Sequence, residues 1–373
     1  MSARSGAESG AMTPAEVLAR SQHVVIKVGS SLVSAAGEVR REWLDGLAHD
    51  VAGLVKAGKQ VTLVSSGAVA LGRADQASPQ TLADKQACAA IGQVALSSAW
   101  RRAFASVDLV MAQVLLTPAD TEHRRRHLNA RATLSALHSR GAIAVINEND
   151  TVATEELRYG DNDQLAARVA QMIGADCVLL LSDVDGLMTA APDSSIDASV
   201  VEWLPAVSKD VLAMAGGSVS GVGTGGMRSK LEAAQRATRS GATVIIANGR
   251  CDHPVAVLQS GSVATVIAAQ SDPGSARRRW IAGMVRTQAS VRIDSGAVNA
   301  LKAGRSLLDV GVVGWSADFE LGDSLSVQTE DGADIGVGLA GMSSTDIHKT
   351  PGGQRREPLI HRDNLVLHKD SDA

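Results

Sequence analysis

Aromatic residues are scarce in this chain of 373 residues, because Phe, Trp and Tyr together make up only 2%. Any core must therefore be aliphatic, and the material is plentiful, since hydrophobic residues reach 45%. The scarcity also argues against binding of single-stranded nucleic acid, whose bases usually stack on aromatic faces. The formal net charge of −4 provides no overall attraction to a polyanion.

Cysteine is equally sparse. Cys88, Cys177 and Cys251 are far apart and form no CxxC pair or Cys/His cluster, which predicts free thiols in a reducing cytosol. Residues 1–21 lack the apolar run of a signal peptide, and no stretch approaches the ~20 apolar residues of a membrane span. We therefore expect a cytoplasmic protein with no membrane partner.

Short apolar runs alternate with longer amphipathic stretches between residues 23 and 267. This alternation predicts an α/β fold with an open, mostly parallel sheet and helices on both faces. In such folds ligands bind beyond the carboxyl ends of the strands, so we expect the chemistry there. The predicted strands are 23–28, 60–65, 108–116, 142–147, 176–182 and 242–247, with helical stretches that include 42–56 and 81–104.

The composition of the sequence changes at residues 270–276, QSDPGSA, where turn-forming residues cluster. Beyond them, short β-like runs punctuated by Gly, Asp and Ser predict a small β-rich domain. The predicted division is a disordered segment at 1–21, a catalytic domain at 22–270 and the β-rich domain at 277–368. The β-like runs are 280–285, 290–293, 308–313, 321–328 and 335–339.

Lys27 lies at the end of the first predicted strand, where it opens the turn Val28-Gly29-Ser30-Ser31. A lysine in an apolar strand is costly to bury unless its ammonium emerges at the strand end, where bare backbone donors also suit a phosphate. The alternative is a lysine that extends to solvent from an ordinary turn. Ser65-Ser66-Gly67 repeats this pattern at the end of the next strand. The segment either binds an anion at a helix N-terminus or simply caps the helix.

Two polar clusters flank one connection. Asn147-Glu148-Asn149-Asp150-Thr151 follows an apolar strand, and Gly160-Asp161-Asn162-Asp163 opens an amphipathic stretch. Acid and amide groups of this kind can bind an amino group, orient a lysine or hold hydrated magnesium. A calcium loop is the competing interpretation, but the EF-hand spacing and its closing glutamate are absent.

Two further loops suit a nucleotide. Ser182-Asp183 follows an apolar strand, where it could line a pocket or form an ordinary Asp-Gly turn. The run from Gly221 to Lys230, GVGTGGMRSK, contains GxGxxG but lacks the preceding strand of a dinucleotide fold, and no Walker A motif occurs. A glycine loop that opens a helix with a lysine one turn inside can bind phosphates, and the alternative is a merely flexible loop.

Together these segments resemble the amino acid kinase family. The stretch from Asn147 to Asp163 is similar in particular to the members that phosphorylate glutamate, and the C-terminal part is similar to the PUA domain that many of those bacterial enzymes carry. The first resemblance rests on VVIKVGSSLV, VSSGAVALGR, AQVLLT, LNARATL, VINENDTVATEE, YGDNDQLAARVA, LLLSDVDGL, SGVGTGGMRSKLEAA and IIANG, and the second on RRRWIAG, DSGAVNAL, SLLDVGV and IHRDNLVL.

The resemblance implies a transferase that uses ATP and Mg²⁺ to phosphorylate the glutamate γ-carboxylate, giving glutamyl 5-phosphate, the first step of proline biosynthesis. By this resemblance, the catalytic residues are Lys27 and Lys230, on the ATP phosphates, and Asp163, which orients both lysines. The other implied roles are glutamate binding by Ser66, Asp150 and Asn162, a position near the metal for Asp161, and nucleotide binding by Lys27, Ser182, Asp183, Thr224, Gly225, Gly226, Met227, Arg228, Ser229 and Lys230.

The resemblance also implies proline as feedback inhibitor, a homo-oligomer (a dimer or a tetramer) and delivery of the labile acyl phosphate to a reductase. A sibling kinase acting on aspartate, acetylglutamate, carbamate or UMP is the first alternative. RNA binding through the PUA-like domain is the second, and residues 277–373, with 12 basic and 13 acidic residues, give it little support.

Overall fold

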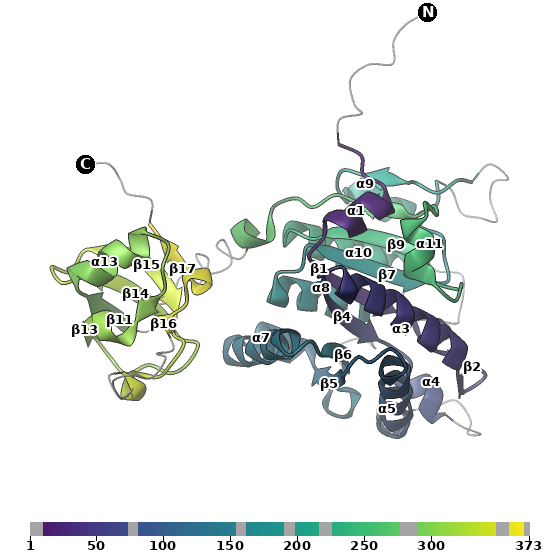
Figure 1. Cartoon of the computed structure of the whole chain (residues 1–373), viewed down its shortest axis with the longest axis horizontal. Helices are drawn as coiled ribbons and strands as arrows, with labels where there is room; N and C mark the ends of the chain where they lie inside the picture. The colour runs from purple at the N-terminus through teal and green to yellow at the C-terminus, as the bar shows by residue number, and fades with distance from the viewer. Residues whose placement is uncertain are drawn as a thin grey trace, which may run out of the picture. The chain divides into compact units, whose positions relative to one another are not determined.

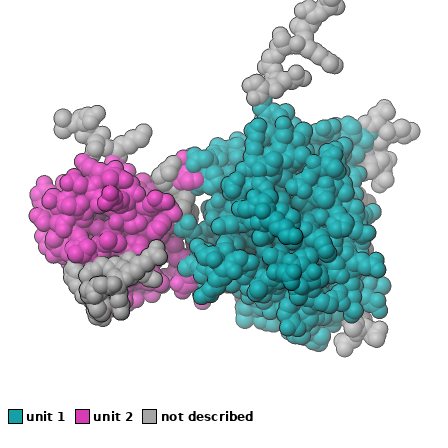
Figure 2. Space-filling view, viewed as in Figure 1, with its two compact units in different colours: residues 1–122, 130–273 teal, residues 123–129, 274–373 magenta. Residues whose placement is uncertain are grey.

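The computed structural model describes residues 10–73, 81–153, 162–189, 198–215, 226–276, 289–347 and 358–368. The chain divides into two compact units, coloured separately in Figure 2. Unit 1 comprises residues 1–122 and 130–273, and unit 2 comprises residues 123–129 and 274–373. Within the described ranges, no helix combines the length and the apolar character needed to cross a membrane.

Unit 1 is built on an eight-stranded sheet with the order β5-β6-β4-β1-β7-β9-β10-β8 (Figure 1). The six strands from β5 to β9 are parallel, and short β10 then runs antiparallel to β9. All six predicted strands are present, which confirms the α/β class. The strands are β1 His23–Val28, β4 Gln60–Ser65, β5 Met111–Leu116, β6 Ile143–Glu148, β7 Cys177–Ser182, β8 Trp203–Leu204, β9 Thr243–Asn248 and β10 Thr265–Ile267.

Side chains that alternate along each strand build a separate apolar core on each face of the sheet. The expectation of purely aliphatic cores is wrong for one of them, because Trp43, Trp100 and Phe104 are buried in it. In β1, Val24, Ile26 and Val28 join one core, which α1, α3, α5 and α11 cover. Val25 joins the other core, which includes residues of α7, α8 and α10. The helices are α1 Pro14–Arg20, α2 Ser30–Val33, α3 Arg41–Lys56, α4 Ala68–Gly72, α5 Leu82–Ala105, α6 Pro118–Glu122, α7 Arg124–Ser139, α8 Asn162–Ile173, α9 Lys209–Met214, α10 Met227–Arg239 and α11 Pro254–Gln259.

Helix α1 corrects the prediction of a disordered segment at 1–21 for residues 14–20, while residues 1–9 lie outside the described residues. Thr13 and Glu16 form a reciprocal capping box at its start, where Pro14 supplies a preset backbone angle. Val17 and Leu18 are buried in the same core as β1. Burial of these two side chains stabilises a helix that would be too short to persist alone.

Helix α5 packs closely against α4 because glycines lie at the contact. A Cβ atom on Gly92 would come within 1.9 Å of the Ala68 carbonyl oxygen, and one on Gly72 within 1.8 Å of the Cys88 carbonyl oxygen. The two helix backbones therefore approach more closely than any larger residue would allow. This packing fixes the position of the residue that follows, Gln93.

Unit 2 is β-rich, as predicted. Its five-stranded sheet has the order β13-β11-β14-β15-β17, with β11 and β14 parallel and the other pairs antiparallel. The predicted run 308–313 is interrupted by a 3-10 turn at Asp309–Gly311, and the run 280–285 lies outside the described residues. The elements are β11 Ala289–Ile293, α13 Ser295–Lys302, β12 Leu307–Leu308, β13 Val312–Trp315, β14 Ser324–Thr329, β15 Asp334–Leu339, β16 Pro358–Ile360 and β17 Leu365–Leu367.

Candidate active site

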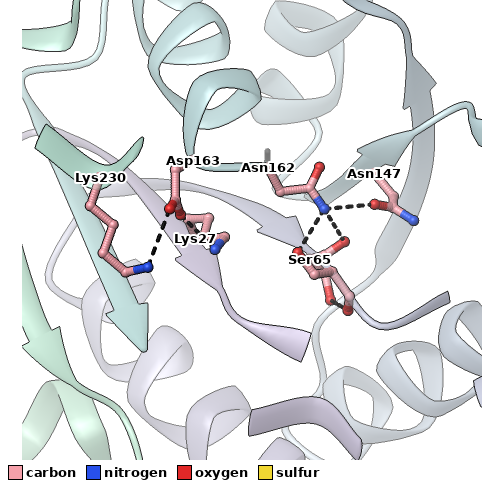
Figure 3. Close-up of polar contacts among 7 residues, drawn as sticks. Lys27, Ser65, Asn147, Asn162, Asp163 and Lys230 are labelled. Atoms are coloured by element: carbon pink, nitrogen blue, oxygen red, sulfur yellow. Dashed lines mark hydrogen bonds and ion pairs between the residues drawn. The ribbon is translucent and has the colours of Figure 1, made fainter. Parts of the chain in front are cut away.

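Polar side chains gather at the carboxyl ends of the central parallel strands of unit 1 (Figure 3). Lys27 lies two residues after Val25, so both side chains point to the face of the sheet that α8 and α10 cover. Helix α8 begins at Asn162 and Asp163, and α10 begins at Met227 with Gly226 as its N-cap. The three elements therefore converge on one point from distant parts of the sequence.

Asp163 bridges two lysines at that point. Its Oδ1 lies 2.5 Å from Nζ of Lys27, and its Oδ2 lies 3.4 Å from Nζ of Lys230 (Figure 3). The Asp163 side chain is fully buried, and the two lysine side chains are only 9% and 8% exposed. The carboxylate thus holds two ammonium groups side by side at the end of β1.

The electrostatics of Asp163 follow from this arrangement. Burial favours its neutral form, but the ammonium groups of Lys27 and Lys230 outweigh burial and hold the pKa of Asp163 below its ordinary value. The side chain is therefore ionised at neutral pH. A pair of cations held in this way suits an anionic ligand such as a phosphate group.

A network of amides lies beside the lysine pair. Nδ2 of Asn162 donates to Oγ of Ser66 at 2.7 Å, to Oδ1 of Asn147 at 3.0 Å and to the Ser65 carbonyl at 3.4 Å (Figure 3). Nδ2 of Asn147 then donates to Oε1 of Gln93 at 2.8 Å. Oδ1 of Asn162 is buried and accepts no hydrogen bond within the described part of the chain. An unsatisfied buried acceptor is costly and indicates a missing donor, such as a ligand group.

A cavity of about 240 Å³ opens between α5 and the ends of β5 and β6. Its apolar lining residues are Ala89, Ala90 and Val94 of α5 and Leu115 of β5. Burial raises the pKa of Asp150 to about 6. The polar lining residues are Gln93, Gln113, Glu148, Asn149, Asp150 and Thr151. This cavity can hold a small polar molecule with a positively charged group.

Two buried hydroxyls mark the other side of the lysine pair. Ser182 ends β7 on the same face of the sheet as Lys27, and Ser229 lies in the first turn of α10. Neither Oγ has a hydrogen-bond partner among the described residues. Together with the N-terminal end of α10, these hydroxyls suit the phosphates of a nucleotide.

The remaining predicted residues either lie on the surface, in ion pairs that do not include the lysine pair, or fall outside the described residues. Asp183 is exposed and lies 3.9 Å from Nη2 of Arg250, and Arg228 pairs with Glu232 on the surface of α10. Asp161, Thr224 and Gly225 lie outside the described residues. In the ranges that are described, no three His, Cys, Asp or Glu side chains gather into a metal site.

A model described as the amino acid kinase family matches residues 22–248, which is more than half of the chain. The chain belongs to the amino acid kinase family. A model described as the PUA domain matches residues 289–359, which lie in unit 2.

Curated relatives of this amino acid kinase match it along nearly their full length. A protein of Rhodopseudomonas palustris (strain BisB5) named glutamate 5-kinase is 45% identical over 93% of this chain and 96% of its own. One of Rhizobium etli (strain CIAT 652) with the same name is 44% identical over 95% of both chains. Carbamate kinase from Giardia lamblia bound to AMP-PNP, a solved structure, is 17% identical over 67% of this chain and 99% of its own, with a TM-score of 0.47.

The site of this amino acid kinase combines predicted and unpredicted residues. The structure brings Lys27, Asp163 and Lys230 together, and it brings Asn162 to Ser66. Gln93 and the network role of Asn147 were not predicted. Gln93 lies inside an Ala-rich helix, where a single glutamine gives no local signal, and only the fold carries it to Asn147.

Proposed function

We propose that the chain transfers the γ-phosphoryl group of ATP to the side-chain carboxylate of glutamate, giving glutamyl 5-phosphate, the first step of proline biosynthesis. The observation that carries the proposal is the buried Lys27–Asp163–Lys230 cluster beside an amide-lined cavity. The relatives named glutamate 5-kinase support glutamate over the acceptors of sibling kinases, because they match along nearly their whole length.

In this proposal the acceptor site is the cavity and the amide network next to it. Asp150 and Oδ1 of Asn162, which has no hydrogen-bond partner among the described residues, are acceptors that suit the ammonium group of an amino acid. The hydroxyl of Ser66, which accepts from Asn162, completes the predicted glutamate-binding set. An ammonium near Asp150 would also offset the burial that now raises the pKa of this carboxyl group.

The nucleotide would lie on the other side of the lysine pair. Ser182 and Ser229 would satisfy their buried hydroxyls on it, and the start of α10 would face its phosphates. The predicted residues Asp183, Thr224, Gly225 and Gly226 belong to the same proposed pocket. Magnesium would enter with the nucleotide, since it usually binds through substrate phosphates and one or two carboxylates. Asp161 stays the predicted carboxylate.

The chemistry that these residues can perform follows from charge. A glutamate carboxylate has an ordinary pKa of about 4.3, so it is already ionised at neutral pH and needs no general base. One of its oxygens bonds to the γ-phosphorus while the bond from that phosphorus to the bridging oxygen of ADP breaks. Lys27 and Lys230 reduce the repulsion between the two anions and stabilise the charge that spreads over the transferring group. Asp163 keeps both ammonium groups in place.

The product is an acyl phosphate, which hydrolyses readily. We therefore propose transfer to a reductase, inhibition by proline at or near the acceptor site, and a homo-oligomer, all as the family resemblance implies. The cytoplasm is the proposed location, and the three cysteines are free, as a reducing compartment would keep them.

The test is ADP release in the presence of Mg²⁺, with glutamate, aspartate, acetylglutamate, carbamate or UMP as acceptor, with and without proline. Hydroxylamine is added to trap an acyl phosphate as the hydroxamate. Glutamate-dependent turnover with hydroxamate formation is the expected result. Turnover on another acceptor alone would overturn the proposed substrate, and no turnover on any acceptor would overturn the kinase activity.

A further inference from the structure

We propose that Gln93 is a specificity-determining residue of the acceptor site. Its side-chain oxygen, Oε1, fixes the orientation of the side-chain amides of Asn147 and Asn162. Its side-chain NH₂ group donates a hydrogen bond to the α-carboxylate of the acceptor amino acid. This inference rests on the proposed function and names the group that recognises one end of its substrate.

The direction of the amide network is set by a backbone carbonyl. The Ser65 carbonyl oxygen can only accept, so the Asn162 group that faces it must be the NH₂ group. That NH₂ group also faces Asn147, which must therefore present its oxygen. The NH₂ group of Asn147 is then directed at Gln93, which must present its oxygen in turn. Three amides thus share one orientation, and reversing any of them would place two donors or two acceptors together.

This direction leaves Gln93 with a donor. Oε1 is engaged by Asn147, whereas its Nε2 makes no hydrogen bond within the described ranges. Gln93 also lines the cavity, together with Glu148, Asn149 and Asp150. The backbone beneath it is held by the close contact of Gly92 with α4, and the hydrogen bond from Asn147 holds the end of its side chain.

An amino acid is complementary to such a cavity. The acidic groups of the cavity suit the ammonium, and the neutral NH₂ group of Gln93 suits a carboxylate. The γ-carboxylate must face the lysine pair to react, so the α-carboxylate is the group left for Gln93. Because Gln93 is neutral, it can bind this carboxylate without neutralising Asp150, whose charge the ammonium needs.

The substitution Gln93→Glu separates the two roles of the side chain. A glutamate at this position still accepts from Asn147, so the orientation of the network survives, but it loses the donor and adds a negative charge. We expect KM for glutamate to rise roughly 10- to 100-fold, as for loss of a hydrogen bond to a charged group. KM for ATP should stay within about twofold. Gln259→Glu, at an exposed position of α11, is the matched control and should leave both values unchanged.

The decisive readout is the ratio of kcat/KM for glutamate to that for its α-amide, isoglutamine, which lacks the α-carboxylate. Wild-type protein should prefer glutamate, and this preference should fall about tenfold or more in Gln93→Glu. A reduced folded fraction lowers both values equally, so the ratio reports recognition even if the variant is partly unfolded. Gln93→Leu, which loses both roles, should show the same loss of preference and a lower kcat.

An unchanged preference in both variants would overturn the role of Gln93 while leaving the proposed kinase activity intact. An equal rise in KM for ATP would also overturn it, because it would indicate a general structural role. Absence of glutamate-dependent turnover in the wild-type protein would overturn the proposed function, and this inference with it.

Discussion

Replacing Asp163 with asparagine should damage stability and catalysis together. The substitution keeps the size and shape of the side chain but removes the negative charge between Lys27 and Lys230. The two ammonium groups would then lie side by side without this carboxylate. Asparagine also presents an NH₂ donor on one side, and the ammonium group of a lysine offers no acceptor for it.

The size of the effect can be estimated from burial. Asp163 is fully buried, and its oxygens lie 2.5 Å and 3.4 Å from the two lysine nitrogens. Removing one member of a buried ion pair costs roughly 3–5 kcal/mol. In a domain of this size each kcal/mol lowers Tm by about 2–4 °C, so a drop on the order of 10 °C is expected. Turnover should fall by roughly 10²–10³, as when other preorganised charged groups lose their position.

The assay is thermal melting of both proteins between neutral pH and about pH 3, with glutamate-dependent ADP release measured at neutral pH. Because the folded pKa of Asp163 lies below its ordinary value, its contribution is fully present above the unfolded pKa, near 4. The contribution is lost as pH falls through the lower, folded pKa. The Tm difference between wild type and Asp163→Asn should therefore be full at neutral pH and narrow in acid.

The control is Asp108→Asn, at an exposed residue with a positive φ angle that asparagine tolerates. Its Tm and turnover should match the wild type. A Tm for Asp163→Asn within about 2 °C of the wild type would refute the reasoning, because it would mean that the carboxylate does not balance the two lysines. A Tm difference that is independent of pH would refute the electrostatic origin of the effect.

Three further predictions concern single side chains. Lys230→Met should keep the fold and lower turnover by orders of magnitude, and wild-type kinetics would contradict the phosphate role. Burial raises the pKa of Asp150 to about 6, so kcat/KM for glutamate should decrease as the pH is lowered through about 6. In Asp150→Asn, kcat/KM should be low at every pH and should show no such decrease. Burial, and to a lesser extent the nearby His138, lowers the pKa of His23 to about 3. The stability that the neutral, buried imidazole contributes is therefore full above the unfolded pKa of His, about 6.5, and is lost as the pH falls toward 3. His23→Gln should reduce the drop in Tm between pH 7 and pH 5.

Much of this protein was determined by local sequence. Alternating apolar and amphipathic stretches predicted the parallel sheet and its two helical layers, because burial on both faces imposes that pattern. The position of Lys27 at the end of an apolar strand placed it at the carboxyl edge, where ligands bind in such folds. Turn-forming residues and short β-like runs predicted the separate β-rich unit. These features depend on near neighbours in the chain, so the sequence alone reveals them.

Only the tertiary structure decided which polar groups meet. Helix α1 exists because Val17 and Leu18 find a core formed by distant strands. Gln93 reaches Asn147 because Gly92 lets α5 approach α4, across 54 residues of sequence. The direction of the amide network depends on a single backbone carbonyl at Ser65. Hydrogen bonds of this kind require positions fixed to within a few tenths of an ångström, which packing of the whole unit supplies and local pattern does not.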